Sequence, residues 1–146
     1  MWTLTEDLTL FPELNEHATI YNVNNFFKVK FPKALRMSGR GYSDLKSPVF
    51  DGMPKSPSRG KAAEITIVKR LEAEQVVKRT MIALGHCDEQ SAKLVRMRYF
   101  NPKIQYDYQA WAELHYAERT YQYYKNKALL MFADAYIYDD LHIYKK

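Results

Sequence analysis

The sequence predicts an all-α protein with an N-terminal helix, a linker, a long helix and a C-terminal helix-turn-helix. Apolar residues recur at steps of three and four in several segments, which is the period of an amphipathic helix. Near the C-terminus a short helical pattern, a three-residue turn and a longer helical pattern follow one another, as in a helix-turn-helix. We therefore divide the 146 residues into an N-terminal arm and helix (1–37), a linker (38–61) and a C-terminal unit (62–146).

The N-terminal third is predicted to hold an irregular acidic arm, residues 1–14, and one helix, residues 15–31. Asn15 is a suitable N-cap. The apolar face of this helix is formed by Ile20, Val23, Phe27 and Phe31. Pro32 is expected to interrupt the helix, because proline lacks an amide hydrogen and clashes with the preceding turn.

The linker is recognised by its composition. It contains four of the five glycines and three of the six prolines, which cannot sustain a regular element. The run MPKSPS, residues 53–58, lies at its centre. Two interpretations remain open, a plain extended linker and an ordered segment that packs across a partner.

Residues 62–84 are predicted to form the longest helix, with Gly85 as its left-handed C-terminal residue. Its apolar face consists of Val68, Leu71, Val76, Met81 and Leu84. A helix of this length is suited either to support the following helices as a scaffold or to form the interface of a homodimer. Sedimentation at micromolar concentration would test the dimer, which the apolar N-terminal arm also favours.

Capping residues define the C-terminal helices. Asp88 is a good N-cap for a helix that ends before Asn101-Pro102. A short helix, 108–114, a turn, 115–117, and a helix that begins at Glu118 and runs at least to Ala135 follow. The turn needs one residue with positive φ, and His115 takes that position, which histidine tolerates at some cost.

The last helix has one apolar and one polar face. The buried face is predicted to consist of Tyr121, Tyr124, Ala128, Met131 and Ala135. The opposite face carries Arg119, Gln122, Tyr123 and Asn126, with Lys125 at its edge and Lys127 on a flank. An ordinary surface helix would show a similar pattern.

These polar residues suit a helix in the major groove of DNA. Arginine, glutamine and asparagine make paired hydrogen bonds to base edges, and lysine contacts phosphates. We expect Arg119, Gln122, Tyr123 and Asn126 to read the groove, and Lys125 and Lys127 to bind phosphates. Further phosphate contacts could come from Arg96, Arg98 or the basic segment 28–46.

Composition limits the other classes of function. The net charge of +5 and the pI near 9.2 favour a polyanionic partner. One cysteine, Cys87, suits a reducing compartment, and the sequence has no membrane-spanning run or secretion signal, so we expect a cytoplasmic protein. The four histidines are scattered, and no metal site, cofactor motif or catalytic constellation is evident. We expect a protein that is not an enzyme.

Three stretches of the chain carry a family resemblance: His17–Ile20 with Val23 and Phe27, then Phe31-Pro32 and Leu35–Gly39; Asp44-Leu45 through the run MPKSPS; and Tyr116–Tyr121 running on to Tyr124–Leu130. In these stretches the chain resembles the ArpU-like transcriptional regulators of phages and prophages in Gram-positive bacteria. The resemblance implies a C-terminal part similar to region 4 of sigma-70 factors. It also implies DNA binding and control of phage late, lysis or packaging genes, in the bacterial host cell.

The sequence departs from this family at the helix pair. His115 stands where the family usually has glycine, Ala117 where it has a serine or threonine cap, and Trp111 where a small residue is expected. Either the pair opens wider, or Ala110 or Ala112 takes the crossing.

Double-stranded DNA is thus the expected partner. The alternative is a protein-binding adaptor of host RNA polymerase, or a DNA-packaging recognition subunit like a small terminase, with tyrosines as interface anchors. The tail, residues 136–146, could continue the helix, add a strand or pack on a second subunit.

Overall fold

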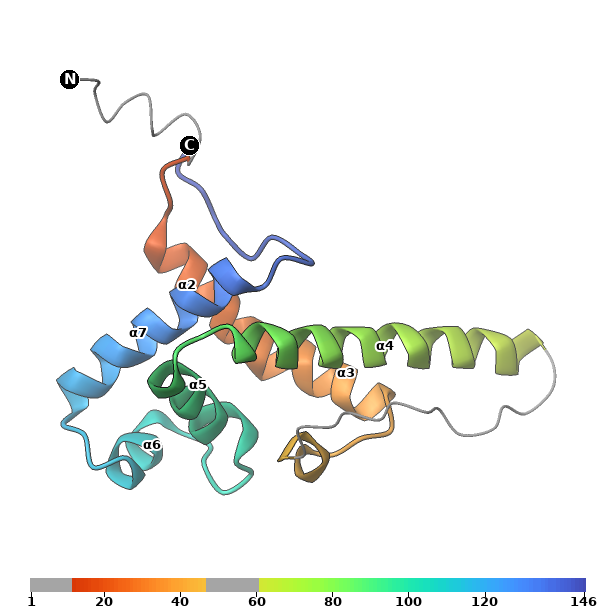
Figure 1. The fold of residues 1–146 in the computed structure, drawn as a ribbon, viewed down its shortest axis with the longest axis horizontal. Helices are drawn as coiled ribbons and strands as arrows, with labels where there is room; N and C mark the ends of the chain where they lie inside the picture. The colour runs from red at the N-terminus through yellow and green to blue at the C-terminus, as the bar shows by residue number, and fades with distance from the viewer. Residues whose placement is uncertain (1–11, 47–60) are drawn as a thin grey trace.

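The computed structural model describes residues 12–46 and 61–146, which form helices and turns without a β-strand (Figure 1). The α-helices are α2 (Glu16–Asn25), α3 (Phe31–Met37), α4 (Lys61–Gly85), α5 (Glu89–Val95), α6 (Asp107–Glu113) and α7 (Glu118–Ala135). Two π-helical turns, η1 (Phe26–Lys30) and η3 (Arg96–Phe100), and one 3₁₀ turn, η2 (Tyr42–Lys46), complete them. None of the helices in these two ranges is long and apolar enough to cross a membrane.

Pro32 does not end the N-terminal helix, contrary to the prediction from sequence. α2, η1 and α3 form one continuous rod, in which Pro32 occupies the first turn of α3. The amide of Phe31 donates to the carbonyl of Phe26, five residues earlier, so the helix is widened immediately before the proline. This wider turn accommodates the ring that would clash in a regular α-helix.

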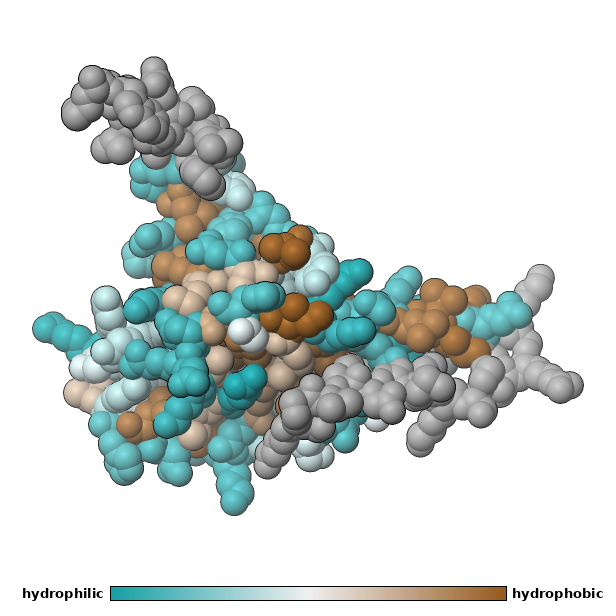
Figure 2. Space-filling model, viewed as in Figure 1, coloured by the Kyte–Doolittle hydropathy of each residue, from teal (hydrophilic) through white to brown (hydrophobic). Residues whose placement is uncertain are grey.

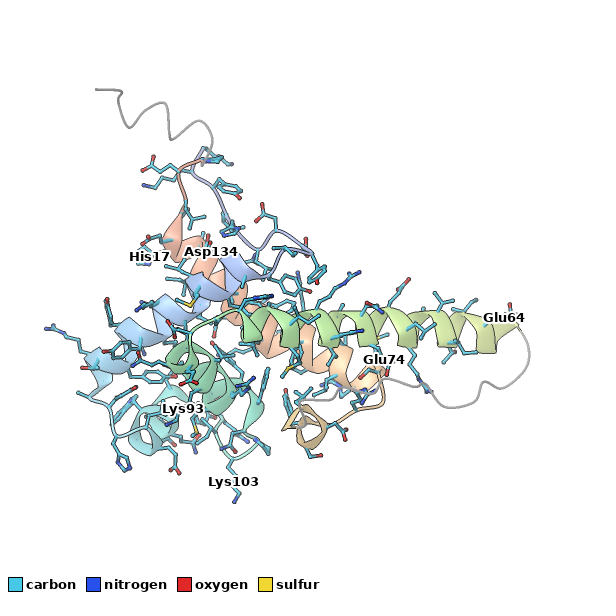
Figure 3. The ribbon with its side chains drawn as sticks, viewed as in Figure 1. His17, Glu64, Glu74, Lys93, Lys103 and Asp134 are labelled. Carbon is cyan, nitrogen blue, oxygen red and sulfur yellow. The ribbon has the colours of Figure 1, made fainter. Side chains whose placement is uncertain are left out.

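The rod ends at Gly39, whose φ of 78° is the left-handed conformation that glycine adopts without cost. The following segment is ordered up to Lys46. Leu45 is buried in the core, and Arg40 forms an ion pair with Glu74 of α4 at 3.2 Å (Figure 3). The start of the predicted linker is therefore packed against the body, while MPKSPS lies outside the described residues.

An aromatic cluster joins the N-terminal rod to the C-terminal helices. Phe27 stacks on Tyr99 with ring centroids 4.9 Å apart and lies 4.6 Å from the Phe132 ring. Phe31 stacks on Phe100 at 5.1 Å. Because these rings come from η1, α3, η3 and α7, residues distant in sequence share one core.

α4 extends well beyond this core (Figure 1). Val77, Ala83 and Leu84 are fully buried, but the predicted core residues Val68 and Leu71 are 53% and 42% exposed. Together with Ile65 they form an apolar patch on the outer half of the helix (Figure 2). The prediction failed there because only the second half of α4 has helices packed against it. The homodimer stays a prediction.

The prediction for Gly85 was also wrong. It is the last residue of α4 and has no positive φ. The chain turns into α5 instead through Asp88, whose carboxylate accepts a hydrogen bond from the Ser91 amide at 2.7 Å, so the predicted N-cap is confirmed.

The C-terminal tail leaves α7 at Tyr136 and folds back along the start of α2 (Figure 1). Leu141 is buried, and Leu14 and Tyr144 form an isolated antiparallel bridge. The Asn15 amide donates to the Ile143 carbonyl at 2.8 Å. The tail thus packs on its own chain, an outcome the sequence did not decide.

His142 ties this tail to α7. Its ring nitrogens lie 2.7 Å from Asp134 and 2.7 Å from Asp140; Asp134 is seen near the end of α7 and the start of α2 (Figure 3). Burial lowers the pKa of the imidazole, but the hydrogen bonds to both carboxylates raise it more, and the net shift is upward from 6.5.

We therefore expect a pH-dependent contribution from the His142 contacts. Because the pKa is higher in the folded than in the unfolded protein, this contribution is complete below about pH 6.5 and disappears as the pH rises through the folded value. An NMR titration should give a His142 pKa above 6.5, lowered by Asp134→Asn. Asp139→Asn, in the same tail, is the control. A wild-type value at or below 6.5 would contradict the assignment.

Candidate functional site

The turn between α6 and α7 is a Schellman motif with histidine in place of glycine. The His115 amide donates to the Ala112 carbonyl at 3.2 Å, and the Tyr116 amide donates to the Trp111 carbonyl at 2.9 Å. His115 has a φ of 59°, as predicted from its position. Ala117 then takes the N-cap position of α7 without a side-chain hydrogen bond.

Ala110 provides the close contact between the two helices. It is fully buried against Tyr121 of α7 and Leu94 of α5, while Ala112 is exposed and Trp111 packs at the edge of this cluster. Of the alternatives left open by the sequence, the structure therefore selects Ala110 as the crossing residue. The indole of Trp111 does not enter the contact.

The buried face of α7 is broader than predicted. Tyr121 and Ala128 are buried as expected, but Tyr124, Met131 and Ala135 lie at the edge and are only partly covered. The remaining buried residues are Lys125, Leu129, Phe132 and Ala133. The reason is that α7 packs against α5 on one side and α2 on the other, and the sequence pattern of one helix does not show how many neighbours it has.

One carboxylate joins three elements beneath the helix pair. Asp107, the first residue of α6, accepts hydrogen bonds from Arg98 Nε at 2.8 Å and from the Tyr121 hydroxyl at 3.0 Å. The Lys125 ammonium donates to both Asp107 oxygens, at 2.9 and 3.0 Å. We call these four residues the Asp107 cluster; it links η3, α6 and α7.

The cluster keeps Asp107 ionised. Burial raises the pKa of this carboxyl, but the hydrogen bonds from Arg98 and Lys125 outweigh burial and bring the pKa to about 2. Burial also raises the pKa of Tyr121, and the neighbouring Asp107 raises it further. At neutral pH the carboxylate therefore faces a protonated phenol and two cations.

Lys125 and Arg98 are consequently not free surface cations. We predicted Lys125 at the edge of the exposed face, but its side chain is 10% exposed and that of Arg98 is 6% exposed. The reason is that Asp107 of α6 lies against Lys125 and forms an ion pair with it at 2.9 Å. The assignment of Lys125 as a freely exposed phosphate ligand is corrected accordingly.

The other predicted site residues do form a shared surface. Arg119, Tyr123, Asn126 and Lys127 are exposed, and Gln122 is partly exposed. Tyr123 is 65% exposed, and its ring meets Tyr124 edge to face at 5.3 Å. The polar face of α7 thus presents hydrogen-bonding groups and two cationic side chains to solvent.

Additional exposed cations lie on neighbouring elements. Lys93 is on α5, Arg96 is on η3, and Lys103 projects from the loop before α6 (Figure 3). Gln90 of α5 donates to the Tyr116 hydroxyl at 3.1 Å and so connects α5 to the turn before α7. Exposed basic side chains are therefore found on α5, η3 and the loop before α6 as well as on α7.

Sequence reasoning did not identify Asp107, which has the most partners in this region. One signal was present: an acidic residue opens α6, where a carboxylate is favoured by the helix dipole. Its partners Arg98 and Lys125 come from other elements, so the sequence could not reveal the cluster.

Cys87 lies between α4 and α5 and is half-buried, as expected for a residue at a helix junction. Its thiol lies 3.5 Å from the Ala83 carbonyl. Burial raises the pKa of the thiol to about 11, with contributions from Asp88 and Asp134. The sulfur is therefore protonated and a poor nucleophile at neutral pH.

The sequence of this chain is similar to that of a protein named as a regulator. The chain is 30% identical over 138 residues to the "Putative autolysin regulatory protein ArpU" of Enterococcus hirae. The match spans 94% of this chain and the whole of that protein. No family model matches the chain, and no solved structure matches it.

Proposed function

Since this chain belongs to the ArpU family of regulatory proteins, we propose that it is a sequence-specific DNA-binding regulator of transcription. α6 and α7 would form a helix-turn-helix like that of sigma-70 region 4, with α7 in the major groove. The controlled genes would be phage or prophage genes for late functions, lysis or packaging. The relative is named as a regulator of autolysin.

The exposed polar face of α7 is the observation that supports this proposal best. Arg119 and Asn126 can each make paired hydrogen bonds to a base edge, and Gln122 lies between them on the helix. Lys127 on α7, and the exposed Lys93, Arg96 and Lys103 on other elements, offer charge to phosphates. The Asp107 cluster holds α6 against α7, which would fix the angle at which α7 enters a groove.

Selection of bound duplexes from a random-sequence pool tests the proposal directly. The wild-type protein should enrich one sequence, and its affinity for that duplex should fall steeply between roughly 50 and 200 mM salt. A protein that enriches no sequence, and whose affinity for DNA is independent of salt, would refute the proposal.

Arg119→Ala should relax the site preference of the protein. It is expected to weaken binding to the selected duplex by about 1–3 kcal/mol, with a much smaller loss on random duplex, because a base contact is lost. Lys127→Ala is the matched comparison: it should weaken both duplexes alike and lower the salt slope by about 1. Equal losses on both duplexes for both variants would contradict this division of roles. Fluorescence anisotropy titrations measure both quantities.

A second candidate function rests on the exposed tyrosines. Tyr106 and Tyr108, at the start of α6, are 58% and 59% exposed and stack on each other with ring centroids 5.8 Å apart. Such rings often anchor protein interfaces, which fits an adaptor of RNA polymerase or a packaging subunit. Substituting both tyrosines with serine should abolish binding to a protein partner but leave the salt-dependent affinity for DNA intact.

A further inference from the structure

The Asp107 cluster contains more positive than negative charge. Arg98 and Lys125 share one carboxylate, and within the described ranges neither has a second acidic partner. Both cationic side chains are at least nine-tenths covered, whereas the Asp107 side chain is 33% exposed. An unbalanced charge is costly where water is largely excluded, and the cluster opens to solvent on the side of the carboxylate.

A third cation lies beside this cluster. The Tyr99 hydroxyl donates to Asn24, the Tyr99 ring stacks on Phe27, and the Arg98 guanidinium lies 5.2 Å from the centre of the same ring. Lys28 directly follows Phe27 and lies one helical turn beyond Asn24, on the part of the rod that contacts Tyr99. Its charge also contributes to the lowering of the Lys125 pKa.

Lys28 is available to a ligand. Its side chain is exposed, and in residues 12–46 and 61–146 no carboxylate forms an ion pair with it. The packing of Phe27 against Tyr99 and Phe132 holds the adjacent backbone in place. Three cations from two distant parts of the chain thus lie near one carboxylate, and the excess positive charge favours a second anion at the exposed Lys28.

We propose that a backbone phosphate of DNA is the second anion, held by the exposed Lys28 of the N-terminal rod beside the Asp107 cluster. This inference rests on the proposed function and extends it, because it gives the N-terminal region a direct part in DNA binding. Lys125 lies on α7 next to Asn126 and one turn after Gln122. The phosphate would therefore belong to the strand that borders the base pairs read by these two residues.

The physical consequence is a longer DNA-binding surface. α7 would contact base edges in the major groove, and the rod formed by α2, η1 and α3 would contact the DNA phosphate backbone beside that groove. Phosphate contacts fix the orientation of a protein on the duplex without reading its sequence. Lys28 would thus add affinity and register rather than preference for a base.

Lys28→Ala tests this arrangement, with Lys33→Ala as the matched control. Both lysines are exposed on the same rod, but only Lys28 follows the residue that packs on Tyr99. The probe is the duplex enriched by the wild-type protein, compared with a random duplex of equal length. We expect Lys28→Ala to reduce the slope of log affinity against log salt by about 0.9 and to weaken both duplexes by the same factor. Lys33→Ala should leave the slope unchanged.

Thermal unfolding followed by circular dichroism verifies that both variants fold like the wild type. If the wild type binds DNA and the slope of Lys28→Ala equals that of the wild type, the inference fails and the proposed function stands. Equal reductions in slope for Lys28→Ala and Lys33→Ala would also refute it, since the contact would then be diffuse. If the wild type shows no salt-dependent binding, the proposed function itself fails.

Discussion

Asp107→Ala is expected to lower the free energy of unfolding by about 3 kcal/mol, because it leaves two nearly buried cations without their anion. Arg98 and Lys125 lose hydrogen bonds of 2.8 and 2.9 Å, and the Tyr121 hydroxyl loses its acceptor. The estimate lies at the lower end of the range for buried pairs, since Asp107 is 33% exposed. Urea denaturation at pH 7 measures the change.

Glu113→Ala provides the control, because Glu113 is an exposed carboxylate of the same helix and its loss should change stability by less than about 0.5 kcal/mol. A second comparison isolates the mechanism. Adding Lys125→Met to Asp107→Ala removes one unpaired buried cation and should recover part of the lost stability. No recovery, or an effect of Asp107→Ala no larger than that of Glu113→Ala, would contradict the role of the cluster.

The same carboxylate should make the protein sensitive to acid. Because the pKa of Asp107 is about 2 when folded and near 3.8 otherwise, its contribution to stability is complete above about pH 4. It disappears as the pH falls from there through about 2. The difference in unfolding free energy between wild type and Asp107→Ala should therefore shrink in this window.

Phe27→Ala should cost about 3–5 kcal/mol of stability, the range for removing a large buried aromatic side chain. The Phe27 side chain is 1% exposed and contacts the rings of Tyr99 and Phe132 at 4.9 and 4.6 Å. Its loss opens a cavity where the N-terminal rod packs against η3 and α7. Thermal and urea unfolding, followed by circular dichroism, give the size of the effect.

Tyr21→Ala is the matched control, an aromatic residue of the same rod that is 74% exposed and should tolerate the change. Since both parts of the chain share the aromatic cluster, Phe27→Ala should lower the midpoint of a single transition. Two separate transitions in the circular dichroism signal of Phe27→Ala, one of them at the wild-type midpoint, would show that the rod and the C-terminal helices unfold independently.

Local sequence rules predicted the elements around the proposed reading helix well. Asp88 and Asn15 cap their helices, His115 adopts the positive φ that the turn requires, and α7 begins at Glu118. Each of these outcomes depends on a few neighbouring residues and on the hydrogen bonds of one turn. Arg119, Tyr123, Asn126 and Lys127 are exposed as expected for the same reason.

The errors arose where several elements meet. Lys125 is spaced like an edge residue, but it is buried and paired with Asp107 of α6. Val68 and Leu71 are spaced like core residues, but no described helix covers the outer half of α4. Pro32 would break a regular helix, yet the π turn before it accommodates the ring. In the first two cases the deciding contact, or its absence, involves residues that are not neighbours in sequence, whereas the π turn before Pro32 is a local adjustment of the backbone.

By itself the sequence determined that this protein is helical, where most of its helices begin and end, and most of the polar residues that α7 presents, because helical period and capping are properties of short segments. Only the tertiary structure decided that the N-terminal rod packs on α7, and that Asp107 gathers Arg98, Tyr121 and Lys125 and so removes Lys125 from the exposed face. Burial and ion pairing depend on distances between remote residues, and the folded chain alone sets those distances.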